Sequence, residues 1–467
     1  MHGNGTIISV GNATISVPAS AALTGLLLAN IRSELEGSAV NQPHPAGGPG
    51  TSRFPIIIPG PSAPGTNSVV IPDSDTGVID LPSGYAFAVY QGNGSLFGGD
   101  SHTVIIGDLN YSGGAGTVLS TSSVTSATNM VSDTQSGAVM SFATGTNTVT
   151  AAGTGQRVNL DAGANVVLAD QAGLSVMQAA GSSTINSSAS TAGSSTVMAT
   201  GGNVTFFGFG TGNDVASVSG AQTTLLFLGE GGTDTIHGGA GADTVFAGAA
   251  LYTGGTGTNL FVGGAGTSTL YGAAKETIYS GTGGGVWNLA SNSSNFFAAA
   301  GGSASAMAAD TVMLGAGSAG SAIVWSANNE HLTLGAPSGA SGAVVIGYGN
   351  NNVIDMSKSA GGNTVVLWNV DLNATQPFTG NVTLTASDAG KDSFVLFGSL
   401  FSLPSAAAHT ITIDNWQASD ILDLSAGYSS AQAAAATAAL ASGSSFTLSD
   451  GTTVQFNGAK PSTIIHV

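Results

Sequence analysis

Residues 238–248 read GGAGADTVFAG, and this stretch decides the fold that the sequence predicts. Three glycines lead to Asp243, and a short run with strong β-propensity, Thr-Val-Phe, follows at once. The same order of turn and strand residues recurs nearby. The copies are GEGGTDTIH at 229–237, GGTGTNLFV at 254–262, GGAGTSTLY at 263–271 and the weaker FGTGNDVAS at 209–217. Such recurrence indicates one supersecondary unit that repeats along the chain.

A looser form of this repeat extends from about residue 83 to residue 400. Short strand-forming phrases follow glycine-rich turns at intervals that are often 8–12 residues, with no helical stretch between them. Stacked coils of this kind bury small apolar residues and leave Thr, Ser and Asn outside. The pattern predicts an all-β protein with a parallel β-solenoid or β-roll. A β-sandwich is the alternative, because its hairpins recur at the same interval.

The composition limits the classes of partner. The chain of 467 residues is 42% hydrophobic, which is enough for a sizeable core. It has 7 Lys and Arg against 25 Asp and Glu, and its net charge is −18. Nucleic acid is excluded as a partner because binding phosphates needs basic side chains, and cations are favoured instead. The chain has no cysteine, so disulfides and thiolate metal sites are excluded.

The nonapeptide GGAGADTVF at 238–246 resembles the GGxGxDxUx repeat of the repeat-in-toxin family, in which U is a large apolar residue. Proteins of that family form parallel β-rolls that bind calcium in these turns. The resemblance implies that the turn carbonyls and the aspartate supply hard oxygen ligands to calcium, the expected cofactor. The calcium-binding residues that it implies are Asp214, Asp234, Gly238, Gly241, Asp243, Gly254 and Asn259.

The copies depart from the family pattern in an informative way. Asn259 and Ser268 stand where the family has aspartate, and the step from Asp243 to Asn259 is sixteen residues rather than eighteen. In the β-rolls of the family, loops one coil apart share each calcium ion, which pairs Asp243 with Asn259 and Asp214 with Asp234. We therefore expect one to three calcium ions. The alternative is a vestigial turn in which the aspartate only caps the bend.

The N-terminal 82 residues divide into two parts. Residues 1–40 contain two strand-like pieces, TIISV and ATISV, and an amphipathic helix with Leu23, Leu27, Ile31 and Leu35 on one face. Residues 41–82 hold nine of the fourteen prolines and are expected to be extended. This segment is either a linker or an arm that contacts a neighbouring subunit. The apolar anchors of such an arm are Phe54, Ile56, Ile57 and Ile58.

The C-terminal region, residues 401–467, resembles the end of proteins exported by type I secretion systems. The matching pieces are the acidic strands around DNWQASDILDLS, an Ala-rich helix, a hairpin that turns on Ser449-Asp450-Gly451 and an apolar tail. The resemblance implies export to the cell surface or beyond without an N-terminal signal peptide, and MHGNGTIISV carries no Lys or Arg. The leucine-rich run at 21–31 is too short to span a membrane, so no membrane insertion is expected. Alternatively, the terminal hairpin caps the solenoid.

The sequence favours a structural role over catalysis. It contains neither HExxH nor GxSxG, and the pairs Asp100–His102 and Glu330–His331 are interpreted as exposed turns. We expect a secreted, calcium-dependent, self-assembling extracellular protein, such as a surface-layer, filament or biofilm-matrix subunit. It would be a head-to-tail homo-oligomer with a cell-surface polysaccharide as a further partner. The alternatives are a calcium-stabilised adhesin or ligand-binding β-solenoid and, less favoured, a polysaccharide-active β-helix enzyme.

Overall fold

The computed structural model describes backbone and side chains for most of residues 146–466. The described ranges are 146–169, 171–187, 193–290, 295–303, 305–315, 322–335, 342–347, 351–367, 381–397 and 409–466. Before residue 146 it describes mainly strand backbones. The predicted helix around Leu27 and the anchors Phe54 and Ile58 lie outside the described residues. The chain forms two compact units, Met1–Gly232 and Thr233–Val467.

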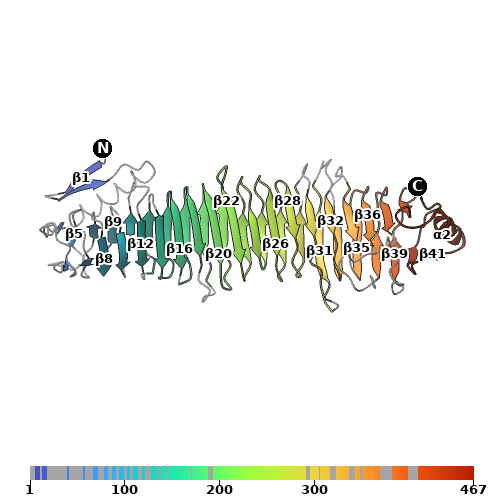
Figure 1. The fold of residues 1–467 in the computed structure, drawn as a ribbon, viewed down its shortest axis with the longest axis horizontal. Helices are drawn as coiled ribbons and strands as arrows, with labels where there is room; N and C mark the ends of the chain where they lie inside the picture. The colour runs from blue at the N-terminus through green and yellow to red at the C-terminus, as the bar shows by residue number, and fades with distance from the viewer. Residues whose placement is uncertain are drawn as a thin grey trace. The chain divides into compact units, whose positions relative to one another are not determined.

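Both units are parallel β-solenoids, which confirms the predicted fold class. Each coil places one strand in an odd-numbered sheet and the next strand in an even-numbered sheet, and each strand pairs in parallel with its equivalent in the next coil (Figure 1). The alternative of a β-sandwich is excluded, because sandwich sheets are built from antiparallel strands.

In the first unit, equivalent strands stack in register. Thr146 pairs with Ala164, which pairs with Ser182, so these coils take eighteen residues each. The odd-numbered strands are β3 (Ala39–Val40), β5 (Asn67–Ile71), β7 (Phe87–Tyr90), β9 (His102–Ile105), β11 (Val118–Ser120), β13 (Val139–Phe142), β15 (Arg157–Leu160), β17 (Ser175–Gln178), β19 (Thr196–Ala199) and β21 (Val215–Val218). The even-numbered strands are β4 (Ile56–Ile57), β6 (Val78–Leu81), β8 (Gly94–Gly98), β10 (Leu109–Gly113), β12 (Thr128–Asp133), β14 (Thr146–Ala151), β16 (Ala164–Ala169), β18 (Ser182–Asn186), β20 (Asn203–Gly208) and β22 (Thr224–Gly229).

The N-terminal strands add two details. The two predicted pieces TIISV and ATISV are β1 (Thr6–Val10) and β2 (Ala13–Val17), which pair antiparallel. Strands β5 and β6 fall within residues 41–82, the predicted linker or arm, and they pair in parallel with β7 and β8. Parallel pairing of the solenoid type therefore begins before residue 83.

The second unit contains nine such pairs of strands, from β23 to β40, in the residues that the structure describes. The odd-numbered strands are β23 (Asp234–His237), β25 (Ala250–Thr253), β27 (Ser268–Tyr271), β29 (Gly285–Asn288), β31 (Ala308–Met313), β33 (Glu330–Gly335), β35 (Asn352–Lys358), β37 (Val382–Thr385) and β39 (Thr410–Asp414). The even-numbered strands are β24 (Thr244–Ala247), β26 (Asn259–Gly263), β28 (Glu276–Tyr279), β30 (Phe296–Ala298), β32 (Ile323–Trp325), β34 (Val344–Gly347), β36 (Thr364–Trp368), β38 (Ser393–Phe397) and β40 (Ile421–Asp423).

The core lies between the two sheets of each unit, because alternate strand residues point inward. In the second unit an aromatic column runs through it. Tyr252 contacts Phe261 at 5.9 Å between ring centroids, Phe261 contacts Trp287 at 5.4 Å, and Trp287 contacts Phe297 at 5.8 Å. All four side chains are buried. Each such ring contributes roughly 2–3 kcal/mol through burial alone.

The C-terminal end of the second unit carries the predicted helix and hairpin. Helix α2 (Ser430–Ser442) begins with a capping box between Ser429 and Gln432 and lies beside β41 (Ser445–Thr447) (Figure 1). Strand β41 pairs antiparallel with β42 (Thr453–Asn457) around the predicted turn, where Gly451 has φ +87°. The acidic strands β39 and β40 belong to different sheets. Within the described residues, no helix has the length and apolar character that spanning a membrane requires.

Candidate functional site

Three polar residues stack at one edge of the second unit, where successive turns enter the even-numbered sheet. Asp243 directly precedes β24, Asn259 begins β26, and Glu276 begins β28. Each of the three side chains is at most 1% exposed. We call this set the acidic corner. It confirms that the sixteen-residue step from Asp243 to Asn259 is one coil, because Thr244 pairs with Leu260.

The acidic corner is joined from coil to coil by hydrogen bonds. The backbone N–H of Asp243 donates to Asn259 Oδ1 at 3.4 Å, and Asn259 Nδ2 donates to Glu276 Oε1 at 3.1 Å. The backbone N–H of Glu276 then donates to Asn295 Oδ1, one coil farther, at 3.0 Å. The side chains of Asn259, Glu276 and Asn295 thus each accept a hydrogen bond from the preceding coil, and Asp243 is joined to the following coil through its backbone N–H.

The same side chains also hold their own turns. Asp243 Oδ2 accepts the backbone N–H of Gly239 at 3.0 Å, and Glu276 Oε1 accepts the N–H groups of Ala273 and Ala274 at 3.2 and 3.4 Å. Capping of this kind is the alternative role considered for the aspartates. The geometry shows that capping and coil-to-coil bonding occur together at Asp243.

Tyr252 reaches the acidic corner from β25 in the opposite sheet. A Cβ added to Gly238 would lie 2.3 Å from Asp243 Oδ2 and 3.2 Å from the Tyr252 hydroxyl, so both groups crowd this glycine. Burial, followed by the charges of Glu276 and Asp243, raises the pKa of Tyr252. Among the described residues, neither the Tyr252 hydroxyl nor Glu276 Oε2 has a hydrogen-bond partner. These two buried oxygens are therefore available to accept a hydrogen bond or to act as a ligand.

The predicted glycines Gly238, Gly241 and Gly254 matter through close approach rather than through a left-handed backbone. None of them has a positive φ. A Cβ on Gly254 would lie 2.6 Å from Glu276 Oε1, and a Cβ on Gly257 would lie 1.9 Å from the carbonyl oxygen of Gly241. Side chains at Gly238, Gly254 and Gly257 would separate the stacked turns, and the carbonyl oxygen of Gly241 is the atom that Gly257 approaches.

The remaining predicted aspartates are also buried. Asp214, in the first unit, accepts the backbone N–H of Ser195 on Oδ1 at 2.7 Å, and burial raises its pKa to about 6 against the opposing effect of that bond. Asp234, in the second unit, is fully buried at the start of β23, opposite Ala250. Because the two residues belong to different units, their predicted pairing stays a prediction.

The acidic corner fits a hard cation in part. Two carboxylates and one amide oxygen lie on three successive coils, and calcium prefers oxygen ligands of these kinds. However, the described residues contain no group of three or more His, Cys, Asp and Glu side chains that could hold a metal ion. Calcium would thus need turn carbonyls or water beside Asp243, Asn259 and Glu276.

Two members of this site were missed by sequence reasoning. Glu276 occupies the aspartate position of YGAAKETIY at 271–279, which overlaps the last residue of GGAGTSTLY, but the segment has one glycine in its turn instead of three. The available signal was the acidic residue before a strand-like Thr-Ile-Tyr, eight residues beyond Ser268. Tyr252 belongs to the opposite sheet and to no motif, so no signal in the sequence places it there.

A second buried carboxyl pair lies farther along the second unit. Asp310 accepts Trp287 Nε1 on Oδ1 and Ser280 Oγ on Oδ2, both at 2.7 Å. Glu330 lies one coil on, because Ala308 pairs with Glu330. Burial, followed by the charge of Asp310, raises the pKa of Glu330 to about 9, and burial raises the pKa of Asp310 too. Glu330 is thus a neutral acid near pH 7.

The predicted pair Glu330–His331 is not an exposed turn. Glu330 begins β33 with its side chain fully buried, and His331 points outward as the next residue of that strand. Consecutive strand residues face opposite sides of a sheet, so the two side chains are separated. Of the other pair, Asp100 lies outside the described residues.

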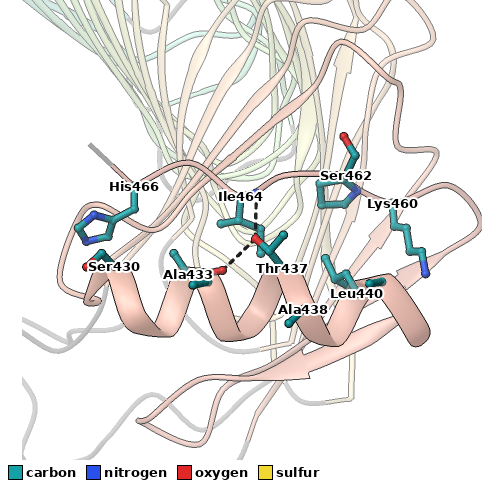
Figure 2. Close-up of a pocket in the computed structure, with 12 residues that line it drawn as sticks. Ser430, Ala433, Thr437, Ala438, Leu440, Lys460, Ser462, Ile464 and His466 are labelled. Atoms are coloured by element: carbon teal, nitrogen blue, oxygen red, sulfur yellow. Dashed lines mark hydrogen bonds between the residues drawn. The ribbon is translucent and has the colours of Figure 1, made fainter.

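A separate hollow of about 820 Å³ lies between α2 and residues 460–466 (Figure 2). Thr437 Oγ1 donates to the carbonyl oxygen of Ala433 at 2.9 Å and accepts the N–H of Ile464 at 3.3 Å, which fixes the C-terminal segment on the helix. Small neutral side chains form most of its wall, with Lys460 and His466 as the titratable groups. The hollow offers little polar chemistry for a ligand.

Comparison with known proteins adds no relative. No protein-family model, curated protein or solved structure matches the chain significantly. The fold and the geometry described above are therefore the basis for function.

Proposed function

We propose that this protein is a secreted, calcium-dependent, self-assembling structural protein of an extracellular array, such as a surface layer, a filament or a biofilm matrix. A cell-surface polysaccharide is the anchor to test. The observation that carries this proposal is the acidic corner, where buried Asp243, Asn259 and Glu276 connect three successive coils. The hydrogen bonds of these residues join one coil to the next and so stabilise the solenoid.

Calcium enters the proposal through the cost of burying charge. Burial raises the pKa of Glu276, although hydrogen bonds from Asn259, Ala274 and Ala273 oppose that shift. A cation beside a buried carboxylate favours its charged form and so stabilises the coils that supply the ligands. Asp243, Asn259 and Glu276 are the residues that would hold calcium, and the ion would supply positive charge and shared coordination between coils.

Export and assembly are supported by other features. The C-terminal region contains the Ala-rich helix and the terminal hairpin that resemble the end of type I secretion substrates. The solenoid form suits an array, since stacked coils give a rigid element with long repeating faces.

The test is a calcium titration of the full chain, from EGTA to millimolar calcium. Light scattering and negative-stain microscopy follow assembly, and circular dichroism follows the melting temperature. We expect ordered sheets or fibres and a higher melting temperature with calcium. The double variant Asp243→Asn/Glu276→Gln should lose most of both responses.

A matched control keeps the same change of charge elsewhere. Asp388→Asn/Asp355→Asn removes two carboxylates that are less buried than the acidic corner and should respond to calcium as the unchanged protein does. An unchanged calcium response in Asp243→Asn/Glu276→Gln would refute the role of the acidic corner. A chain that stays monomeric and folded at every calcium concentration would refute the assembling function.

A further inference from the structure

One outer face of the second unit is apolar along eight consecutive coils. It consists of the outward side chains of the even-numbered strands β24 to β38, and we call it the apolar face. The pairing register puts Phe246 beside Val262 and Val262 beside Tyr279. Its large apolar members are Phe246, Leu260, Val262, Tyr279, Phe296, Ile323, Trp325, Val344, Ile346, Val366, Val395 and Phe397.

The apolar face is uncharged on a strongly acidic chain. Among the described outward residues of β24 to β38, the others are Thr244, Thr277, Ala298, Thr364 and Ser393, so none carries a charge. The odd-numbered sheet of the same unit also exposes Leu251, Tyr271 and Val286, but its outward residues include the charged Asp355 and Lys358. The two outer faces of this unit therefore differ in charge.

The aromatic rings of the apolar face are tilted against each other. Tyr279 and Phe296 lie 6.0 Å apart with an interplanar angle of 61°, and Phe296 and Trp325 lie 6.4 Å apart with an angle of 55°. Tyr279 is 45% exposed and Phe246 is 39% exposed. Tilted rings form projections with small residues such as Ala298 between them. This relief suits interdigitation with another side-chain surface better than stacking on a flat sugar.

We propose that the apolar face packs against the same face of a second copy of this chain, as the lateral contact of the array; this inference rests on the proposed function. The net charge of the chain is the argument for which partner packs against the apolar face. With a net charge of −18, two copies repel each other wherever carboxylates meet, and this face brings none together. An anionic lipid surface would repel the same acidic chain.

The size of the apolar face predicts a weak single contact. Eight strands at about 4.8 Å per strand span roughly 34 Å, and two or three outward residues per strand give roughly 500 Å² per copy. Stable interfaces bury about 800 Å² per partner. One pair of copies should therefore associate weakly, and repetition along an array should strengthen the contact through avidity.

Two pairs of matched variants test the proposal. Ala298→Asp and Thr277→Asp put a carboxylate on the apolar face, and Ala309→Asp and Thr269→Asp put the same change on the outer face of the odd-numbered sheet. Ala298→Asp is matched with Ala309→Asp, and Thr277→Asp is matched with Thr269→Asp. The substitution and the change in net charge are the same within each pair. Sedimentation velocity across protein concentration, with and without calcium, reports association, and circular dichroism confirms folding of each variant.

The outcomes separate this inference from the proposed function. We expect Ala298→Asp and Thr277→Asp to weaken lateral association at least tenfold. The matched variants Ala309→Asp and Thr269→Asp should change it less than twofold. Assembly that is equal in all four variants overturns the apolar face as the contact while the assembling function stands. A wild-type chain that never associates overturns both.

Discussion

Asn259 lies one coil beyond Asp243 and connects it to Glu276: its Oδ1 accepts the Asp243 N–H at 3.4 Å, and its Nδ2 donates to Glu276 Oε1 at 3.1 Å. An aspartate, the residue that the calcium-binding nonapeptide has at this position, lacks the N–H group that reaches Glu276. Asn259 is therefore suited to separating two buried carboxylates without a metal ion. Its amide also donates to the carbonyl oxygen of Gly255 at 3.1 Å.

Asn259→Asp should make the stability of the fold more dependent on calcium than it is in the wild type. Without calcium, the substitution removes both amide donations and places a third carboxylate in a buried site, which should lower the free energy of unfolding by about 2–4 kcal/mol. Calcium should restore much of this loss by neutralising the added charge. Urea unfolding in EGTA and in millimolar calcium measures both effects.

The control for this prediction is Asn288→Asp. Asn288 is a half-exposed residue on the outer side of β29, and its Nδ2 donates to the carbonyl oxygen of Leu270 at 3.1 Å. This variant should lose less than about 1 kcal/mol and gain nothing from calcium, because water solvates its carboxylate. Equal losses in Asn259→Asp and Asn288→Asp would show that burial of the acidic corner does not matter.

The pair Asp310–Glu330 should make the stability of the second unit fall as the pH rises from about 4.5 to about 9. The pKa of Glu330 rises from the ordinary 4.5 to about 9 in the folded protein. Between these values the folded state binds more protons than the unfolded state, so stability decreases as pH rises. Below pH 4.5 the carboxyl is protonated in both states and the full benefit is present. Melting temperatures from pH 4 to pH 10 measure the slope.

Glu330→Gln isolates this contribution. The amide stays neutral, so the variant should flatten the decline and exceed the wild-type melting temperature at pH 9–10. Asp388→Asn, which changes an exposed carboxylate, should keep the wild-type slope. If Glu330→Gln and wild type melt in parallel across the whole range, the buried carboxyl does not titrate as the geometry indicates.

The repeat made the fold and part of the site predictable. TVFA and NLFVG are strands that follow their turns, and the order of glycines, polar residue and apolar residues placed Asp243 one coil from Asn259. These features are local, and each nonapeptide carries them in its own sequence. Local patterns are the part of a solenoid that a single sequence specifies.

The contacts between coils could not be predicted from the spacing of residues in the sequence. The coil from Asp234 to Ala250 takes sixteen residues, whereas the coil from Ala308 to Glu330 takes twenty-two. Because coil length varies, no fixed spacing brings Asp310 and Glu330 together. The role of Tyr252 depends in addition on how far its ring extends across the core, which is a property of packing.

Gly255 should be the least replaceable glycine of the acidic corner. A Cβ at this position would lie 1.4 Å from the carbonyl oxygen of Gly239 in the preceding coil, so an alanine would force the stacked turns apart. Gly255→Ala should therefore lower the free energy of unfolding by more than about 3 kcal/mol, since it breaks the register that joins Asp243 to Asn259. Gly443→Ala is the matched control, because its Cβ would lie 3.4 Å from the nearest atom, the carbonyl oxygen of Ala439. Gly443 has φ −125° and donates its N–H to that same carbonyl, a bond that alanine keeps. Chemical unfolding of both variants compares them directly: a large loss confined to Gly255→Ala supports close stacking as the reason for glycine, and a similar small loss in both contradicts it.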